Sequence, residues 1–222
     1  RFEKDTLTGL ATGVSGGLLA DMCIVFANNA LVVADVSTAQ KKAIDSFDNS
    51  RCYCDIALEN VPGEALVSGE DAREAALHIL ALQAVITAHE QTGGAEALME
   101  TARDYAITRR AFGQVIGAFQ SVKHRIAELY GLVELARANA IHAASRENAD
   151  DFILAAAAAR LSATEAYDTA ARDCVQIHGG IGVTWEAGLH LHQRRARSLA
   201  IEQGNGMFWE DILVRRLVGE AA

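Results

Sequence analysis

The placement of proline constrains this fold more than any other feature of the sequence. Pro62 is the single proline of the chain, so residues 63–222 contain none. Alanine is abundant in the same region and forms an uninterrupted run at residues 155–159. Proline disrupts helix interiors and alanine has the highest helix propensity. Residues 63–222 are therefore predicted to form long helices, and the protein to be mainly α.

The spacing of apolar residues divides this region into separate helices. Five segments have a helical period; these are residues 71 to about 110, 120–148, 150–178, 184–200, and a last segment after Gly206. Thr184 is expected to be the N-cap of the fourth helix, and Gly179-Gly180 to end the third. Long helices with short connections favour an antiparallel four-helix bundle.

Two adjacent glycines, Gly93 and Gly94, lie inside the first predicted helix. Each costs about 1 kcal/mol relative to alanine in a free helix. We therefore expect a neighbouring element to pack closely against the helix at this point.

Residues 1–62 have the composition of β-strands. The apolar segments CIVFA (23–27) and ALVVADV (30–36) flank the turn-forming pair Asn28-Asn29, and RCYCDIAL (51–58) follows them. Two or three strands alone do not cover their apolar face. We therefore predict that residues 1–62 are the C-terminal part of a larger β domain and that residues 63–222 form a separate helical domain.

Composition excludes several classes of function. The formal net charge is −9 and the pI is about 5.2, which argues against a nucleic-acid-binding surface. The four cysteines lack the spacing of a metal site; they are Cys23, Cys52, Cys54 and Cys174. No signal peptide and no apolar run of membrane-spanning length is present, so the sequence predicts a cytoplasmic protein without membrane insertion.

Two motifs in the sequence indicate its function. The first is YAITRRAFGQVIGAFQ at residues 105–120, and the second is QIHGGIGVTWE at residues 176–186. Together, in this order and separated by two helical segments, they resemble the acyl-CoA dehydrogenase family. The resemblance covers nearly the whole chain. It extends to the heteromeric bacterial type of that family, in which two unlike subunits are paired. It implies the family's C-terminal helical domain, preceded by the end of its middle β domain.

The resemblance implies FAD as the cofactor. It assigns Arg109 to the FAD diphosphate, Phe112 to the lining of the cofactor site, and Gln120 to the adenosine part. Guanidinium suits this role because its fixed charge and forked donors match phosphate oxygens. Arg110 is the weaker candidate, because it lies one helical step of about 100° from Arg109.

In the family, the segment that matches Gln176, Gly179 and Gly180 reaches across a subunit interface to the neighbouring subunit's FAD. Glycine allows backbone N–H groups to approach phosphate closely. The resemblance therefore implies an oligomer, either a dimer or a tetramer and either homomeric or heteromeric, in which two molecules hold one cofactor.

The catalytic base is the point at which this sequence departs from the family. The family's carboxylate removes a proton from the α-carbon of an acyl-CoA while hydride passes to the flavin. The position of that carboxylate falls on Gln203, and its alternative position falls on Gln83. An amide cannot accept the proton. Glu202, Glu90 or a partner subunit are the alternative sources of the base.

The sequence thus predicts FAD-dependent α,β-dehydrogenation of an acyl-CoA thioester, with electrons leaving through an electron-transferring flavoprotein. Two alternatives remain open. The chain could be the non-catalytic subunit of a heteromeric acyl-CoA dehydrogenase, or a flavin monooxygenase built on the same fold.

Overall fold

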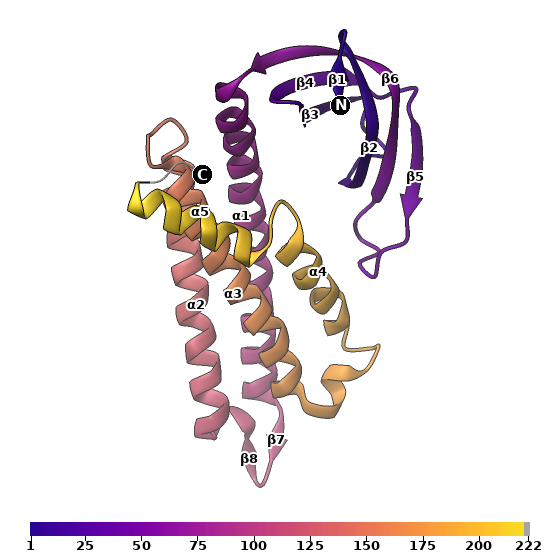
Figure 1. Ribbon diagram of the computed structural model, residues 1–222. Coiled ribbons are helices and arrows are strands. Elements are labelled where there is room, and N and C mark those ends of the chain that lie inside the picture. The colour runs from indigo at the N-terminus through magenta and orange to yellow at the C-terminus, as the bar shows by residue number, and fades with distance from the viewer. Residues whose placement is uncertain (220–222) are drawn as a thin grey trace. The chain divides into compact units, whose positions relative to one another are not determined.

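The computed structural model describes residues 1–219 and contains two compact units, Arg1–Ile79 and Leu80–Ala222 (Figure 1). The first unit contains strands and the beginning of a helix, and the second is helical. A mainly α protein preceded by a β segment was predicted, and this prediction is confirmed.

The β unit is a single antiparallel sheet. Its strands are β1 (Phe2–Glu3), β2 (Thr6–Ser15), β3 (Met22–Ala27), β4 (Ala30–Asp35), β5 (Gln40–Ile44) and β6 (Tyr53–Ser68). They lie in the order β1-β2-β6-β4-β3, with β5 also paired to β6. The sequence predicted β3, β4 and β6 but missed β1, β2 and β5, which have many exposed polar positions or glycines.

Strand β6 links the two halves of this sheet. Its first part pairs with β2 as far as Pro62, and its second part, from Gly63, pairs with β4. Pro62 lies at the change of partner, where its missing N–H interrupts neither ladder. The strand continues to Ser68, beyond the predicted domain boundary at residue 62. A core of fully buried side chains, including Leu7, Val32 and Ile56, lies beneath it.

Five α-helices follow within residues 70–219, and the predicted helical segments are all present. They are α1 (Glu70–Thr108), α2 (Gln120–Ser145), α3 (Phe152–His178), α4 (Leu189–Ile201) and α5 (Gly206–Val218). Helices α2 and α3 pack along one another through small residues, which allow a close approach; Ala136 and Ala140 on α2 and Ala159 and Ala163 on α3 are fully buried.

The start of α4 differs from its prediction. Thr184 was expected as the N-cap, but α4 begins at Leu189, after Gly188 with φ 67°. Thr184 instead closes the short helix η2 (Gly179–Val183), because both its N–H and its Oγ1 donate to the carbonyl of Ile181. The positive φ of Gly188 is the stronger signal for where the chain turns into α4.

The prediction of close packing at the glycine pair is confirmed at Gly94. A Cβ there would lie 2.5 Å from Cζ of Tyr167 on α3. A Cβ at Gly93 would meet no atom within 4 Å. Only one glycine of the pair is therefore required by packing.

Candidate functional site

A surface hollow of about 450 Å³ brings parts of both sequence motifs together. It lies between the end of α1 and the end of α3, at the end of the bundle that also carries the β7–β8 hairpin, Arg110–Ala111 and Gln114–Val115 (Figure 1). Its lining residues are Tyr105, Arg109, Ile116, Ile177, His178, Gly179, Gly180 and Ile181.

Arg109 supplies the positive charge of this hollow. Its backbone is held on both sides: its N–H donates to the Tyr105 carbonyl, and its own carbonyl accepts from Ile116 N–H, each at 2.8 Å. The side chain is exposed, and within residues 1–219 no carboxylate forms an ion pair with it. Arg110 is turned away, because its Nη2 donates to the Gly113 carbonyl at 3.1 Å. The guanidinium of Arg109 is thus available to an anion.

The glycine pair keeps the opposite side of the hollow open. Gly179 ends α3 with φ 61°, and its N–H donates to the carbonyls of Val175 and Gln176. A Cβ at Gly179 or Gly180 would meet no atom of the chain within 4 Å. The space that side chains would fill is therefore free for a ligand, as a diphosphate beside Arg109 requires. The Gly179 N–H is already bonded to carbonyls of the last turn of α3, so Gly179 contributes space to the hollow and not a free donor.

Tyr105 and His178 form an aromatic wall between these groups. Their rings are stacked, with centroids 4.1 Å apart and planes inclined by 22°. The Nδ1 atom of His178 lies 2.7 Å from the carbonyl oxygen of Cys174, one turn earlier on α3. Both residues stand inside the quoted motifs, yet the sequence interpretation gave them no role.

Three other predicted cofactor residues do not line the hollow. Phe112 lies at the tip of the β7–β8 hairpin with φ 51°, and 95% of its surface is exposed. Gln120 is the exposed first residue of α2, and Gln176 is exposed on the last turn of α3. The Phe112 ring meets that of Phe119 edge to face, with centroids 6.2 Å apart.

Arg109 and the glycine pair come together within one chain. The resemblance placed the guanidinium and the glycine segment on different molecules that hold one cofactor. In the structure, Arg109 and Gly179-Gly180 line one hollow of a single chain.

One of the two positions expected to carry a carboxylate, Gln203, is bonded to a buried hydroxyl. Thr87 Oγ1 donates to the side-chain Oε1 of Gln203 at 2.9 Å. Gln83, the other position, lies four residues before Thr87 on α1 and is exposed. The backbone carbonyl of Gln203, which has φ 53°, accepts from Trp209 Nε1 at 3.1 Å. The amide at position 203 is thus fixed at both its side chain and its backbone.

Arg160 anchors the segment that carries Glu202. This arginine is almost fully buried, and its Nη2 donates to the carbonyls of Leu199 and Glu202, the latter at 2.9 Å. Its Nη1 donates to Gln91 Oε1 at 2.7 Å. Burial lowers the pKa of Arg160 to about 10, and the negative charge of Glu202 partly opposes that shift. The sequence interpretation missed Arg160, although a lone cation that ends an alanine run is a recognisable signal.

Glu90, the other alternative base, is held by a cation. Its Oε1 lies 2.6 Å from Nη1 of Arg195 on α4. This ion pair joins α1 to α4 within the helical unit. The contact gives Glu90 a structural partner.

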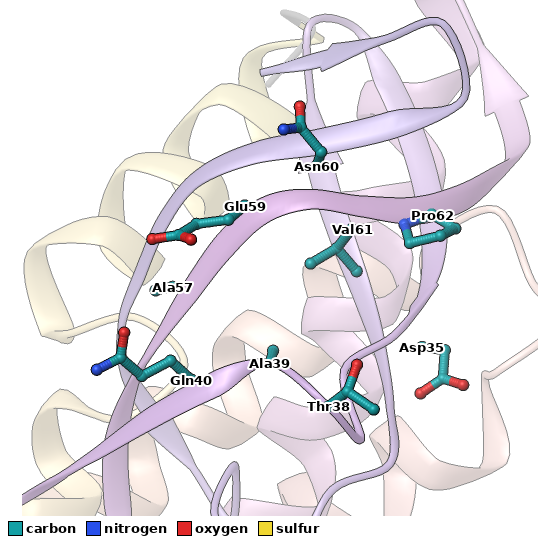
Figure 2. Close-up of a pocket in the computed structure, with 9 residues that line it drawn as sticks. All are labelled: Asp35, Thr38, Ala39, Gln40, Ala57, Glu59, Asn60, Val61 and Pro62. Atoms are coloured by element: carbon teal, nitrogen blue, oxygen red, sulfur yellow. The ribbon is translucent and has the colours of Figure 1, made fainter.

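A second hollow, of about 340 Å³, lies in the β unit. Figure 2 shows Asp35 and Glu59 on opposite sides of it, with Thr38, Gln40 and Asn60 between and around them. Its lining includes no basic side chain. It therefore does not suit a diphosphate, in contrast to the hollow beside Arg109.

Within the described part of the chain, no cluster of three or more potential metal ligands occurs. Among the same residues, none of the helices combines the length and the apolar character needed to span a bilayer.

Comparison with known proteins places this geometry in a family. The family model for the acyl-CoA dehydrogenase C-terminal domain matches residues 73–218. Acyl-CoA dehydrogenase IpdE2 of Mycobacterium tuberculosis is 44% identical over 120 residues, which cover 53% of this chain and 36% of that protein. Acyl-CoA dehydrogenase FadE34 of the same organism is 31% identical over 213 residues, which cover 93% of this chain and 29% of that protein.

Solved structures agree with this comparison. Butyryl-CoA dehydrogenase of Megasphaera elsdenii matches 97% of the chain with a TM-score of 0.89 at 23% identity, which establishes the likeness of fold. The ChsE4-ChsE5 complex of Mycobacterium tuberculosis matches 98% of the chain with a TM-score of 0.84 at 26% identity. The chain spans 62% and 61% of the length of these two structures. By sequence and by fold, the chain belongs to the acyl-CoA dehydrogenase family.

Proposed function

We propose that this chain is a subunit of an FAD-dependent acyl-CoA dehydrogenase in which a partner subunit supplies the catalytic carboxylate. The observation that carries the proposal is the amide at position 203, held by Thr87 where the family resemblance expects a glutamate. The alternative position, Gln83, is also an amide. An amide at these positions can form hydrogen bonds but cannot take up the α-proton.

The Arg109 hollow supports the cofactor part of the proposal. Arg109 would hold the diphosphate of FAD, Gly179 and Gly180 would leave room for it, and Tyr105 with His178 would form the side wall. Bound FAD supplies the hydride acceptor for the β-hydrogen of the acyl-CoA, and an electron-transferring flavoprotein would then reoxidise it. The exposed Phe112 beside this end of the bundle suits a subunit that covers the cofactor from outside.

Glu202 is the competing candidate for the base within this chain. Its carboxylate already balances a buried cation, because its charge raises the pKa of Arg160 against the effect of burial. The Arg160 guanidinium also holds the Glu202 main chain, because its Nη2 donates to the Glu202 carbonyl at 2.9 Å. This contact favours a structural role for Glu202 and a base from another chain. A heteromeric arrangement also has a precedent in shape, since one structural relative is the ChsE4-ChsE5 complex.

The proposal is tested by purifying the full-length protein from its native background and recording the flavin spectrum and the subunit composition. We expect a yellow hetero-oligomer that reduces an artificial electron acceptor with acyl-CoA, together with a second polypeptide that bears the glutamate. A yellow homo-oligomer with full activity would overturn the partner hypothesis. Consumption of oxygen by the reduced flavin, without electron transfer to the acceptor, would instead identify a monooxygenase.

A further inference from the structure

His178 places a polar ring in the wall of the Arg109 hollow, and the position of its proton follows from the geometry. Its Nδ1 lies 2.7 Å from the Cys174 carbonyl oxygen. A carbonyl oxygen can only accept, so Nδ1 carries the hydrogen. In the neutral imidazole the other nitrogen, Nε2, is then a hydrogen-bond acceptor. It lies on the opposite side of the ring from the helix backbone.

Two further contacts hold this ring in place. The Tyr105 ring stacks on the His178 ring with centroids 4.1 Å apart, and His178 is itself the last residue of α3. The neighbouring Cys174 thiol lies 3.7 Å from Nδ1, and burial raises the pKa of that thiol to about 12, so it remains uncharged beside the ring. The acceptor atom is therefore pre-oriented before any ligand binds, which reduces the entropic cost of using it.

The hollow thus contains two kinds of hydrogen-bonding group with opposite requirements. Arg109 offers only donors, which suit phosphate oxygens. A neutral His178 offers an acceptor at Nε2, which phosphate oxygens cannot satisfy but a hydroxyl group can. In a dinucleotide, sugar hydroxyls adjoin the diphosphate on both sides. The combination fits a diphosphate together with a hydroxyl next to it.

We propose that His178 is a positioning residue for FAD, whose Nε2 accepts a hydrogen bond from a sugar hydroxyl next to the diphosphate that Arg109 holds. This inference rests on the proposed function, because it assumes that FAD occupies the hollow. It adds a residue that orients the cofactor rather than one that only neutralises its charge.

The test uses the full-length protein in its native oligomer, with FAD removed and titrated back. His178→Phe keeps an aromatic ring stacked on Tyr105 but removes both nitrogens. His178→Gln places an amide oxygen at the reach of Nε2 and so restores an acceptor. We expect His178→Phe to raise the Kd for FAD by roughly fivefold, as the loss of one hydrogen bond implies. His178→Gln should recover most of that loss, and the melting temperature of both apo variants should stay close to that of the parent.

Arg109→Met, measured in parallel, separates this inference from the proposed function. If Arg109→Met weakens FAD binding and His178→Phe does not, the role of His178 is overturned while the cofactor site stands. The inference is also overturned if His178→Phe weakens FAD binding and His178→Gln does not restore it. The same holds if His178→Phe lowers the melting temperature of the apo protein, because the ring would then have only a structural role. If neither the parent nor any variant binds FAD, the proposed function fails as well.

Discussion

Thr87 on α1 donates a 2.9 Å hydrogen bond from its Oγ1 to the side-chain Oε1 of Gln203, in the connection between α4 and α5. Thr87 is only 4% exposed, so water does not compete strongly for this bond. A carboxylate at position 203 would accept the same bond, and a bond to a charged acceptor is stronger. The surroundings of Gln203 are thus compatible with the glutamate that the sequence lacks.

Gln203→Glu should therefore create a base where the chain has an amide. In preparations that contain FAD but lack a Glu-bearing partner, we expect acyl-CoA oxidation to rise by at least about a hundredfold over the parent, as a positioned general base contributes. The rate is measured with an artificial electron acceptor. Gln203→Met is the matched control, because it has a similar size but no basic group, and it should show no gain. An equal response to both substitutions would contradict the interpretation.

The glycine pair of α1 offers a test of packing with a built-in control. Gly94→Ala should destabilise the protein by about 1–3 kcal/mol, the usual cost of overpacking, because the new Cβ would lie 2.5 Å from the Tyr167 ring. Gly93→Ala meets no atom within 4 Å and should stabilise it by about 1 kcal/mol through helix propensity. Urea denaturation of both variants measures the free energy of unfolding. Stabilisation by both substitutions would show that Tyr167 moves aside without cost.

The neighbouring arginines should differ sharply in their effect on cofactor binding. Arg109→Gln removes the exposed guanidinium of the hollow and should raise the Kd for FAD about tenfold or more, the scale of a charge-assisted hydrogen bond. Arg110→Gln removes a side chain that binds its own hairpin through Gly113, and it should leave the Kd nearly unchanged. Flavin fluorescence during titration gives both values. A larger effect at Arg110 would move the diphosphate away from the hollow.

The four free cysteines should differ in reactivity. At pH 8, iodoacetamide should modify the exposed Cys52 and spare Cys174, which is buried and has its pKa raised to about 12. Mass spectrometry after timed quenching identifies the labelled residues.

Because the raised pKa belongs to the folded state, Cys174 ionises first in the unfolded chain. Its contribution to stability is full below about pH 9 and falls as the pH rises toward about 12. Cys174→Ala should weaken that decline, and early labelling of Cys174 at pH 8 would contradict its burial.

The helical unit could be predicted from sequence because its signals are local. The predicted bounds of α1, α2 and α3 lie within a few residues of the observed ones. Two local signals account for this agreement: no proline follows Pro62, and a glycine stands at position 179. The β unit was harder, because β2 pairs with β6 across about fifty residues of chain and pairings of that range leave no periodic signal. The start of α4 was misplaced since Thr184 has the chemistry of an N-cap but bonds to Ile181 instead.

The sequence motifs indicated candidate site residues but not how one chain brings them together. The motifs named Arg109 and the glycine pair, yet only the packing of α1 against the end of α3 places them in one hollow. His178 and Arg160 were overlooked for the same reason. The stack on Tyr105 and the bonds from Arg160 to the Leu199 and Glu202 carbonyls depend on tertiary contacts, which a spacing argument does not contain.

Arg160 binds two main-chain carbonyls, of Leu199 in the last turns of α4 and of Glu202 just after it, so its support of the α4–α5 connection does not depend on the side chain at position 203. Codons for glutamine and glutamate differ by a single base. A gene duplicate could therefore lose its proton-abstracting group in one mutational step and keep an intact scaffold. Division of labour between sister polypeptides would then need no redesign of the architecture, only a companion that retains the acid.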